Sequence, residues 1–157
     1  MSLDAPKLRP LDASRLSFAV VAARFNPALV DALVDRAQAT LVAAGVKPAR
    51  IRIERVPGSH EVPFGIDALL RSGRFDCALA LGVLIGGDTN HHEMVGNSVS
   101  FALQQISLAR RAPVINGVIV ANTRAQAEER TIGRINRGVE FAEAALEMAA
   151  LHRRLRR

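Results

Sequence analysis

Four apolar runs of this chain are each followed by a short segment rich in polar residues and glycine. These segments are residues 24–26, 57–61, 86–93 and 121–123, and they contain histidine, carboxylate and amide side chains. Such residues can bind anions, move protons and hold polar ligands. If the apolar runs are strands of a parallel sheet, the loops at their carboxyl ends meet at one edge, where ligands of such sheets bind. We therefore expect one site to be built from these four segments.

The segment 86–93 is the most informative of the four. Gly86 and Gly87 let the backbone approach a ligand, and a helix that starts after them exposes free N–H groups, which together suit a phosphate. A glycine turn that only precedes a helix is the competing interpretation. No Gly-Lys-Ser/Thr follows and no G-x-G-x-x-G occurs, so the pattern indicates neither a Walker loop nor a dinucleotide site.

His91 and His92 directly follow this loop, and a histidine beside an anion site can transfer protons near neutral pH. The spacing does not choose between them, and either can instead be a structural hydrogen-bonding residue. A helical zinc motif would need a second histidine at position 96, which is Gly96, and Cys77 is remote. We therefore expect no metal.

Three further residues each have two interpretations. Phe25 is either a core aromatic or a face for a planar heterocycle. Glu61 either binds ligand hydroxyls or caps the next helix. Arg130 either holds a phosphate or is a solvated charge on a helix.

The elements that must position these residues alternate along the chain. Apolar periodicity and capping residues predict strands at 16–23, 51–54, 77–85 and 114–120, and helices at 26–45, 63–70, about 90–106, from 123 to about 132, and 139–149. Asn26 is expected to cap the first helix, Pro27 to occupy its first turn and Gly45 to end it. Thr123 and Gln126 form a capping-box pattern.

This alternation predicts the α/β class: a three-layer αβα, flavodoxin-like fold with a four-stranded parallel sheet and helices on both faces. The 157 residues are expected to form a single domain, with an extended N-terminal arm at 1–14 and a basic tail at 152–157. The strand at 51–54 alternates apolar and charged residues and is placed nearer an edge. A sheet of only four strands leaves edges exposed, so lateral assembly is expected.

Composition argues against several other functions. Four of the 21 Lys and Arg residues lie at 153–157, and the remaining 17 nearly balance the 15 acidic residues, while Trp and Tyr are absent. Neither nucleic acid nor membrane is therefore expected as a partner, and no apolar run is long enough to span a bilayer. The charged first ten residues do not resemble a signal peptide, which favours a cytoplasmic protein. Cys77 lies in an apolar run and is interpreted as a small buried side chain rather than a reactive thiol.

Six motifs in their order and spacing resemble the lumazine synthase family over about residues 16–150. They are Arg24-Phe25-Asn26, Val56-Pro57-Gly58-Ser59-His60-Glu61-Val62-Pro63, Leu81-Gly82-Val83-Leu84-Ile85, Gly87-Asp88-Thr89-Asn90-His91, Pro113-Val114-Ile115-Asn116-Gly117 and Gln126-Ala127-Glu128-Glu129-Arg130. The resemblance implies a cofactor-independent transferase of riboflavin biosynthesis. Its reaction condenses 5-amino-6-(D-ribitylamino)uracil with 3,4-dihydroxy-2-butanone 4-phosphate to 6,7-dimethyl-8-ribityllumazine, phosphate and water.

The resemblance also implies roles for individual residues. His91 aligns with the proton-transferring histidine of the family, and Phe25 with an aromatic residue that stacks on the pyrimidine. The substrate-binding set it implies is Phe25, Ser59, His60, Glu61, Val83, Leu84, Ile85 and Asn116; the phosphate-binding set is Gly87, Asp88, Thr89 and Arg130. Asn116 matches a position that a neighbouring subunit contributes, so the site is expected to span two chains.

The implied assembly is a homo-oligomer, a pentamer or an icosahedral shell (capsid) of pentamers, with riboflavin synthase as a further partner. The chain departs from the family at Gly86, where Arg is common, at His60 and His92, where aromatics are frequent, and at Arg137, where Lys is frequent. These departures leave an alternative function: a poorly active homologue that binds lumazine or flavin, or forms a shell.

Overall fold

The computed structural model describes residues 11–156, and a parallel sheet of four strands lies at its centre. The strands are β1 (Phe18–Ala23), β2 (Ile51–Val56), β3 (Cys77–Ile85) and β4 (Val114–Ala121), arranged in the order β2-β1-β3-β4. All three strand pairs are parallel. Because every strand is followed by a helix, all four carboxyl ends lie at the same edge of the sheet, as the sequence predicts.

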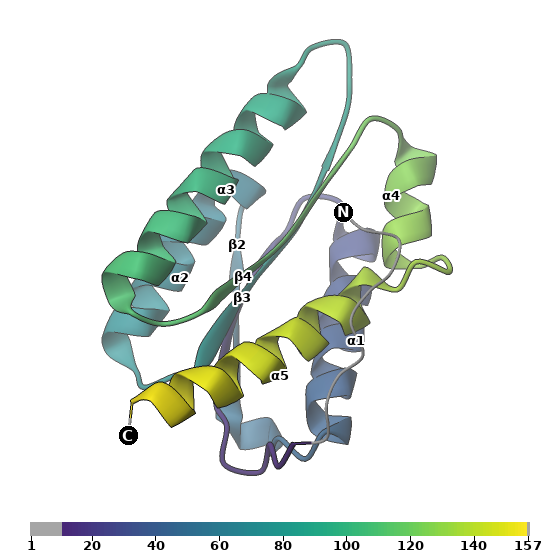
Figure 1. Ribbon diagram of the computed structural model, residues 1–157. Coiled ribbons are helices and arrows are strands. Elements are labelled where there is room, and N and C mark those ends of the chain that lie inside the picture. The colour runs from purple at the N-terminus through teal and green to yellow at the C-terminus, as the bar shows by residue number, and fades with distance from the viewer. Residues whose placement is uncertain (1–10, 157) are drawn as a thin grey trace.

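Helices cover both faces of this sheet (Figure 1). One face carries α1 (Pro27–Ala43), α4 (Arg124–Thr131) and α5 (Arg137–Leu155), and the other carries α2 (Val62–Ser72) and α3 (His91–Arg110). The short 3-10 helices η1 (Pro48–Arg50) and η2 (Ser59–Glu61) flank β2. The predicted three-layer αβα fold is therefore confirmed.

The hydrophobic core is divided by the sheet into two clusters. Leu33 of α1 and Leu146 of α5 pack with Leu79 of β3 on one face. Ile66 of α2 and Leu103 of α3 pack with Val21 and Ala80 on the other. β1 is buried throughout because it is covered on both faces and hydrogen-bonded on both edges.

β2 lies at an edge of the sheet, as its charged alternation predicts. Arg52 and Glu54 are exposed and form an ion pair at 3.0 Å, while Ile51 and Ile53 pack against the core. Charged side chains on an edge strand discourage pairing with a foreign strand.

The start of α1 agrees with the sequence except for the role of Asn26. Pro27 opens α1 and Gly45, with φ 99°, follows its end, but the Asn26 side chain makes no capping hydrogen bond. Asn26 adopts a left-handed conformation (φ 56°), and its Nδ2 donates to the Val83 carbonyl at 2.9 Å. The prediction that the Asn26 side chain caps α1 is therefore wrong, because its amide instead joins the start of α1 to β3.

At the start of α4 the predicted capping is confirmed. Thr123 Oγ1 accepts a hydrogen bond from the Gln126 N–H at 3.2 Å. The Gln126 Oε1 in turn accepts from the Asn122 N–H at 2.9 Å.

Residues 152–155 of the expected basic tail form the end of α5. His152 Nδ1 lies 2.9 Å from the Asp76 carbonyl oxygen, and Arg153 Nε lies 3.8 Å from the Asp76 carboxylate. These contacts anchor the end of α5 to the start of β3. Most of the expected N-terminal arm, residues 1–10, and Arg157 lie outside the described residues.

Cys77 is fully buried at the start of β3, as predicted. Burial raises the pKa of its thiol well above the ordinary value, because a thiolate would be desolvated there. No helix within residues 11–156 is long and apolar enough to cross a membrane.

Candidate functional site

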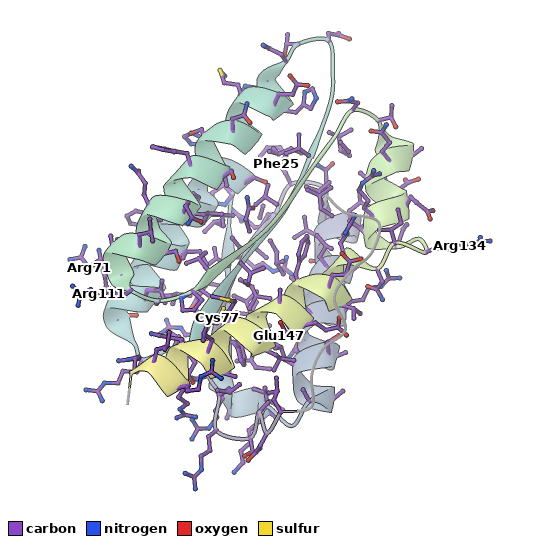
Figure 2. The ribbon with its side chains drawn as sticks, viewed as in Figure 1. Phe25, Arg71, Cys77, Arg111, Arg134 and Glu147 are labelled. Carbon is purple, nitrogen blue, oxygen red and sulfur yellow. The ribbon has the colours of Figure 1, made fainter. Side chains whose placement is uncertain are left out.

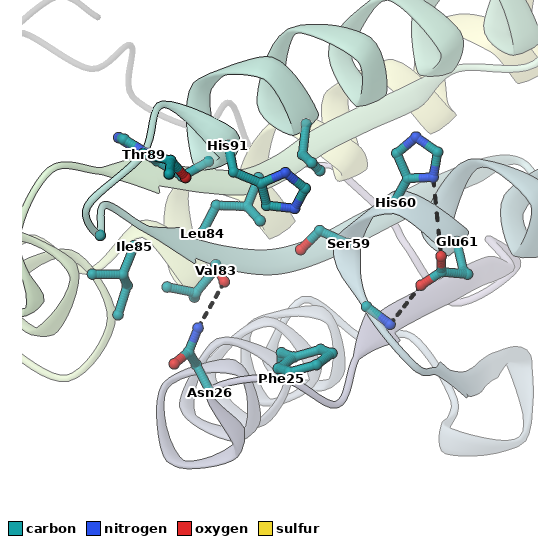
Figure 3. A pocket seen from close by; sticks show the side chains of 14 residues that line it. Phe25, Asn26, Ser59, His60, Glu61, Val83, Leu84, Ile85, Thr89 and His91 are labelled. Carbon is teal, nitrogen blue, oxygen red and sulfur yellow. Dashed lines mark hydrogen bonds and ion pairs between the residues drawn. The ribbon is translucent and has the colours of Figure 1, made fainter.

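A cleft of about 450 Å³ opens at the carboxyl ends of the three strands β1, β2 and β3 (Figure 3). It lies where the loops after these strands meet the first turn of α3. Its walls are formed by Phe25, Asn26, Gly58, Ser59, His60, Glu61, Val83, Leu84, Ile85, Gly87, Thr89, His91, His92 and Val95. The cleft thus brings together ten of the thirteen predicted site residues.

Phe25 is an exposed wall of the cleft. It follows β1 directly, and 70% of its side chain is accessible. A Cβ atom on Gly58 would lie 3.4 Å from the edge of the Phe25 ring, so the small residue lets the ring lie close to the neighbouring loop. The structure therefore rejects the core interpretation and leaves a ring face open to a planar ligand.

Ser59 lies at the bottom of the cleft and is only 4% exposed. Its Oγ is buried without a hydrogen-bond partner in the described structure. A Cβ at Gly82 of β3 would lie 2.4 Å from this oxygen, so only glycine at 82 lets Ser59 occupy its position. An unsatisfied hydroxyl costs free energy, and a polar group of a bound ligand would relieve that cost after a small adjustment.

Glu61 caps the 3-10 helix η2 and also lines the cleft. Its Oε2 accepts a hydrogen bond from the Gly58 N–H at 2.8 Å, which caps η2. Its Oε1 lies 4.0 Å from His60 Nδ1, and the half-exposed side chain also faces the cleft (Figure 3). The carboxylate is held in place by one oxygen while the other remains able to accept from a ligand hydroxyl.

The loop between β3 and α3 presents the features of an anion site. Asn90 makes no side-chain capping bond, so the N–H groups of the first turn of α3 are not satisfied by it. Gly87 and Thr89 line the cleft, and a Cβ at Gly87 would meet nothing within 4 Å. Asp88 is exposed and does not belong to the lining.

His91 and His92 both line the cleft, but their imidazoles differ in surroundings. His92 Nε2 lies 3.3 Å from Asn122 Oδ1, and its Nδ1 is buried without a partner. The exposed His91 makes no hydrogen bond to another side chain within the described residues, and it also faces a second hollow beside Met94 and Ser98. His91 is thus free to interact with a ligand, whereas His92 is tied to the loop after β4.

Asn116 and Arg130 lie away from this cleft. Asn116 is exposed on the edge strand β4, where its Oδ1 accepts from the Val118 N–H at 3.1 Å. Arg130 lies on α4, and its Nη1 donates to the Gln126 carbonyl at 2.9 Å. Neither residue is among the cleft residues of its own chain.

The residue set implied by the family resemblance omits Asn26, Gly58, His92 and Val95, although all four line the cleft. Of these, Val95 alone lies outside the four loop segments from which the sequence predicts the site. Asn26 was assigned to helix capping because Asn before Pro is typical of that role. Its position directly after a buried strand nevertheless places it in segment 24–26 of the expected site. Within residues 11–156, no group of three His, Cys, Asp or Glu residues could hold a metal ion.

Comparison with known proteins adds an independent observation. The family model of 6,7-dimethyl-8-ribityllumazine synthase matches residues 15–153. The chain belongs to this lumazine synthase family. A 6,7-dimethyl-8-ribityllumazine synthase of Aquifex aeolicus is 44% identical over 147 residues, covering 93% of this chain and 96% of that protein. A protein of the same name from Thermococcus onnurineus is 42% identical over 140 residues, covering 89% and 91%.

The lumazine synthase family model matches nearly the whole described chain. The match includes every element of the sheet and all four loops that the sequence singled out. The relative from Pyrococcus furiosus, 41% identical over 140 residues, covers 89% of the chain. The family resemblance therefore covers the whole cleft rather than one motif.

Proposed function

We propose that this chain is a transferase that condenses 5-amino-6-(D-ribitylamino)uracil with 3,4-dihydroxy-2-butanone 4-phosphate. The products are 6,7-dimethyl-8-ribityllumazine, phosphate and water, and the reaction belongs to riboflavin biosynthesis. The observation that carries the proposal is the family match over residues 15–153. The cleft supports it, because an open aromatic face, a polar floor and an anion loop adjoin one another there.

In the proposed complex the pyrimidine ring stacks on Phe25. Val83, Leu84 and Ile85 form the facing wall at the end of β3. The ribityl chain extends toward Ser59, His60 and Glu61, where a buried hydroxyl and a fixed carboxylate accept or donate hydrogen bonds. The phosphate of the second substrate lies at Gly87, Asp88 and Thr89, beside the start of α3.

The chemistry requires positioning and proton transfer. The 5-amino group attacks the ketone and water leaves, phosphate is then eliminated, and the ribityl-bearing nitrogen closes the ring with loss of water. Each stage moves a proton, which His91 is placed to accept and return. Holding the two substrates side by side supplies much of the remaining acceleration.

The proposal includes an oligomer in which neighbouring copies complete each site. Asn116 and Arg130 do not reach the cleft of their own chain, which supports their contribution to the cleft of an adjacent copy. Met94, Phe101 and Leu108 are exposed on α3 at intervals of seven residues. An exposed apolar stripe of this kind is typical of an interface. A pentamer, alone or in an icosahedral shell, and riboflavin synthase as a further partner belong to this proposal.

A cytoplasmic location is part of the same proposal. Its support is chemical: the chain has a single cysteine, which is buried in the core, so the protein uses no intrachain disulfide.

The test is to mix the purified protein with both substrates and to follow lumazine fluorescence and phosphate release. Turnover that yields one phosphate for each lumazine supports the proposal. Tight binding of lumazine or riboflavin without turnover would instead favour the shell or binding protein that Gly86 and His92 leave as the alternative.

A further inference from the structure

Two adjoining hollows lie at the amino ends of the strands, opposite the cleft. The first, of about 450 Å³, lies where α2, α3 and α5 end. The second, of about 410 Å³, lies beside Ser17 before β1 and Asp76 before β3. Arg74 and Arg156 line both hollows, so the two form one groove, which we call the arginine groove.

The lining of the arginine groove is strongly basic. Among residues 11–156, the lining contains six arginines and one carboxylate, Asp76; the arginines are Arg50, Arg74, Arg110, Arg111, Arg153 and Arg156. They come from four separate segments of the chain. The turn after α3 that carries Arg111 lies on the side where α2 also ends (Figure 2). This clustering could not be recognised from the run of arginines at the end of the sequence alone.

Some of these arginines already have partners. Arg110 forms an ion pair with Asp67 at 2.6 Å, and the pKa of Arg110 is raised by that hydrogen bond. Arg153 lies 3.8 Å from Asp76. By contrast, the side chains of Arg74, Arg111 and Arg156 form no ion pair or hydrogen bond within residues 11–156. Three guanidinium groups therefore remain available in one groove.

Helix dipoles explain part of the clustering, because basic residues are favourable at helix C-termini. They do not explain all of it. In the last turn of α3 the Ser107 and Leu108 carbonyls accept hydrogen bonds from the backbone N–H groups of Ala112 and Arg111, not from an arginine side chain. Arg111 also occupies a left-handed conformation (φ 50°), in which a non-glycine residue costs about 1 kcal/mol or more. Glycine would adopt this conformation at a lower free-energy cost than arginine does.

We propose that the arginine groove binds an oligophosphate, in the form of a nucleoside triphosphate or of free inorganic oligophosphate. The guanidinium fork matches phosphate oxygens in geometry and charge. Arg74 and Arg156 stand where the two hollows join, so successive phosphates can bridge them. Phe75 and Leu70 add an apolar wall to the first hollow only, where a nucleoside base would lie.

The same lining argues against a nucleic-acid strand as the ligand. Single-stranded nucleic acid is bound by successive aromatic side chains along a basic channel. Phe75 is the only aromatic residue in the lining besides the imidazole of His152. A short groove with one aromatic wall suits a small polyanion better.

Calorimetric titration of the full-length, assembled protein at low salt, with ATP and with inorganic tripolyphosphate, tests the proposal. We expect saturable binding that high salt weakens, since charged contacts are screened. Arg74→Ala and Arg156→Ala should each weaken it roughly tenfold or more, the usual effect of losing a charge-assisted hydrogen bond. Arg52→Ala, which removes the same charge from β2, is the matched control and should leave affinity within twofold.

Further arms separate the two sources and the competing outcomes. Tighter binding of ATP than of tripolyphosphate, abolished by Phe75→Leu, indicates a nucleotide; equal binding indicates free oligophosphate. Lumazine formation by Arg74→Ala should stay normal, which shows that the variant is folded. Absence of saturable binding, an equal loss in Arg52→Ala, or tight binding of RNA or DNA alone would overturn the proposal.

Discussion

At the scale of single residues, the two adjacent histidines show how the fold separates residues that the sequence leaves equivalent. His91 begins α3 with an exposed side chain, while the His92 imidazole turns toward Asn122. A Cβ at Gly86 would lie 2.7 Å from the Asn122 carbonyl oxygen and 3.1 Å from His92 Nε2. The missing side chain at 86 therefore makes room for the His92–Asn122 contact.

Replacing His91 by alanine should lower kcat by roughly 10²- to 10⁴-fold, the range for losing a positioned proton-transfer group. Substrate affinity should change little, because the imidazole acts mainly in the transition state. Steady-state lumazine fluorescence measures both quantities. His92→Phe is the control and should keep turnover within about tenfold of the unmodified chain. An H91A variant as fast as the parent would refute the proton-transfer role.

Replacing Phe25 by alanine should weaken binding of a pyrimidine analogue by ~1 to 3 kcal/mol, through loss of one stacked ring. Because the Phe25 side chain is mostly exposed, the denaturant concentration at the midpoint of unfolding should change little. Phe18→Ala gives the contrast, since Phe18 is fully buried and its loss should cost ~3 to 5 kcal/mol of stability. Unchanged affinity in F25A would mean that the ring does not contact the ligand.

At the scale of elements, the sheet and the helices could be predicted because their periodicities are strong. β3 is a continuous apolar run, and Val95, Val99 and Leu103 recur at helical spacing along α3. The use of Asn26 could not be predicted, because its amide donates to Val83, which is 57 positions away in the sequence. Such a contact depends on the pairing of β1 with β3. Local sequence patterns carry no information about which strands pair.

Packing between β3 and η2 gives a prediction for an element. Gly82→Ala introduces a Cβ that would meet Ser59 Oγ at 2.4 Å, so η2 must shift. We expect a loss of about 1–3 kcal/mol in stability, the usual cost of overpacking, and a parallel loss of ligand affinity. Chemical denaturation and analogue titration measure the two effects. Gly87→Ala, whose Cβ meets nothing, should unfold like the parent; a G82A variant of full stability and affinity would contradict this packing.

At the scale of the whole molecule, α3 carries no charged residue between Glu93 in its first turn and Arg110 at its end, although much of this stretch is exposed. Replacing Phe101 by glutamate places a charge in the middle of the apolar stripe formed with Met94 and Leu108. If this stripe joins copies of the chain, the particle seen by light scattering should become smaller and turnover should fall with it. Ser100→Glu, on the neighbouring exposed position, is the control and should preserve the particle. An F101E particle of unchanged size would remove α3 from the interface.

If each cleft is formed by two neighbouring copies, two variants that are inactive alone should regain activity in a mixed assembly. If each cleft combines its own His91 with Arg130 of an adjacent copy, His91→Ala and Arg130→Ala chains are both inactive in pure assemblies. In a random one-to-one mixture, a cleft works when an R130A chain supplies the histidine and an H91A neighbour supplies the arginine. About a quarter of the clefts then have both groups, since each condition is met half the time. Co-expression with two purification tags, followed by lumazine fluorescence per particle, measures this fraction. Activity that stays at the level of the pure variants would place Arg130 outside the neighbouring cleft.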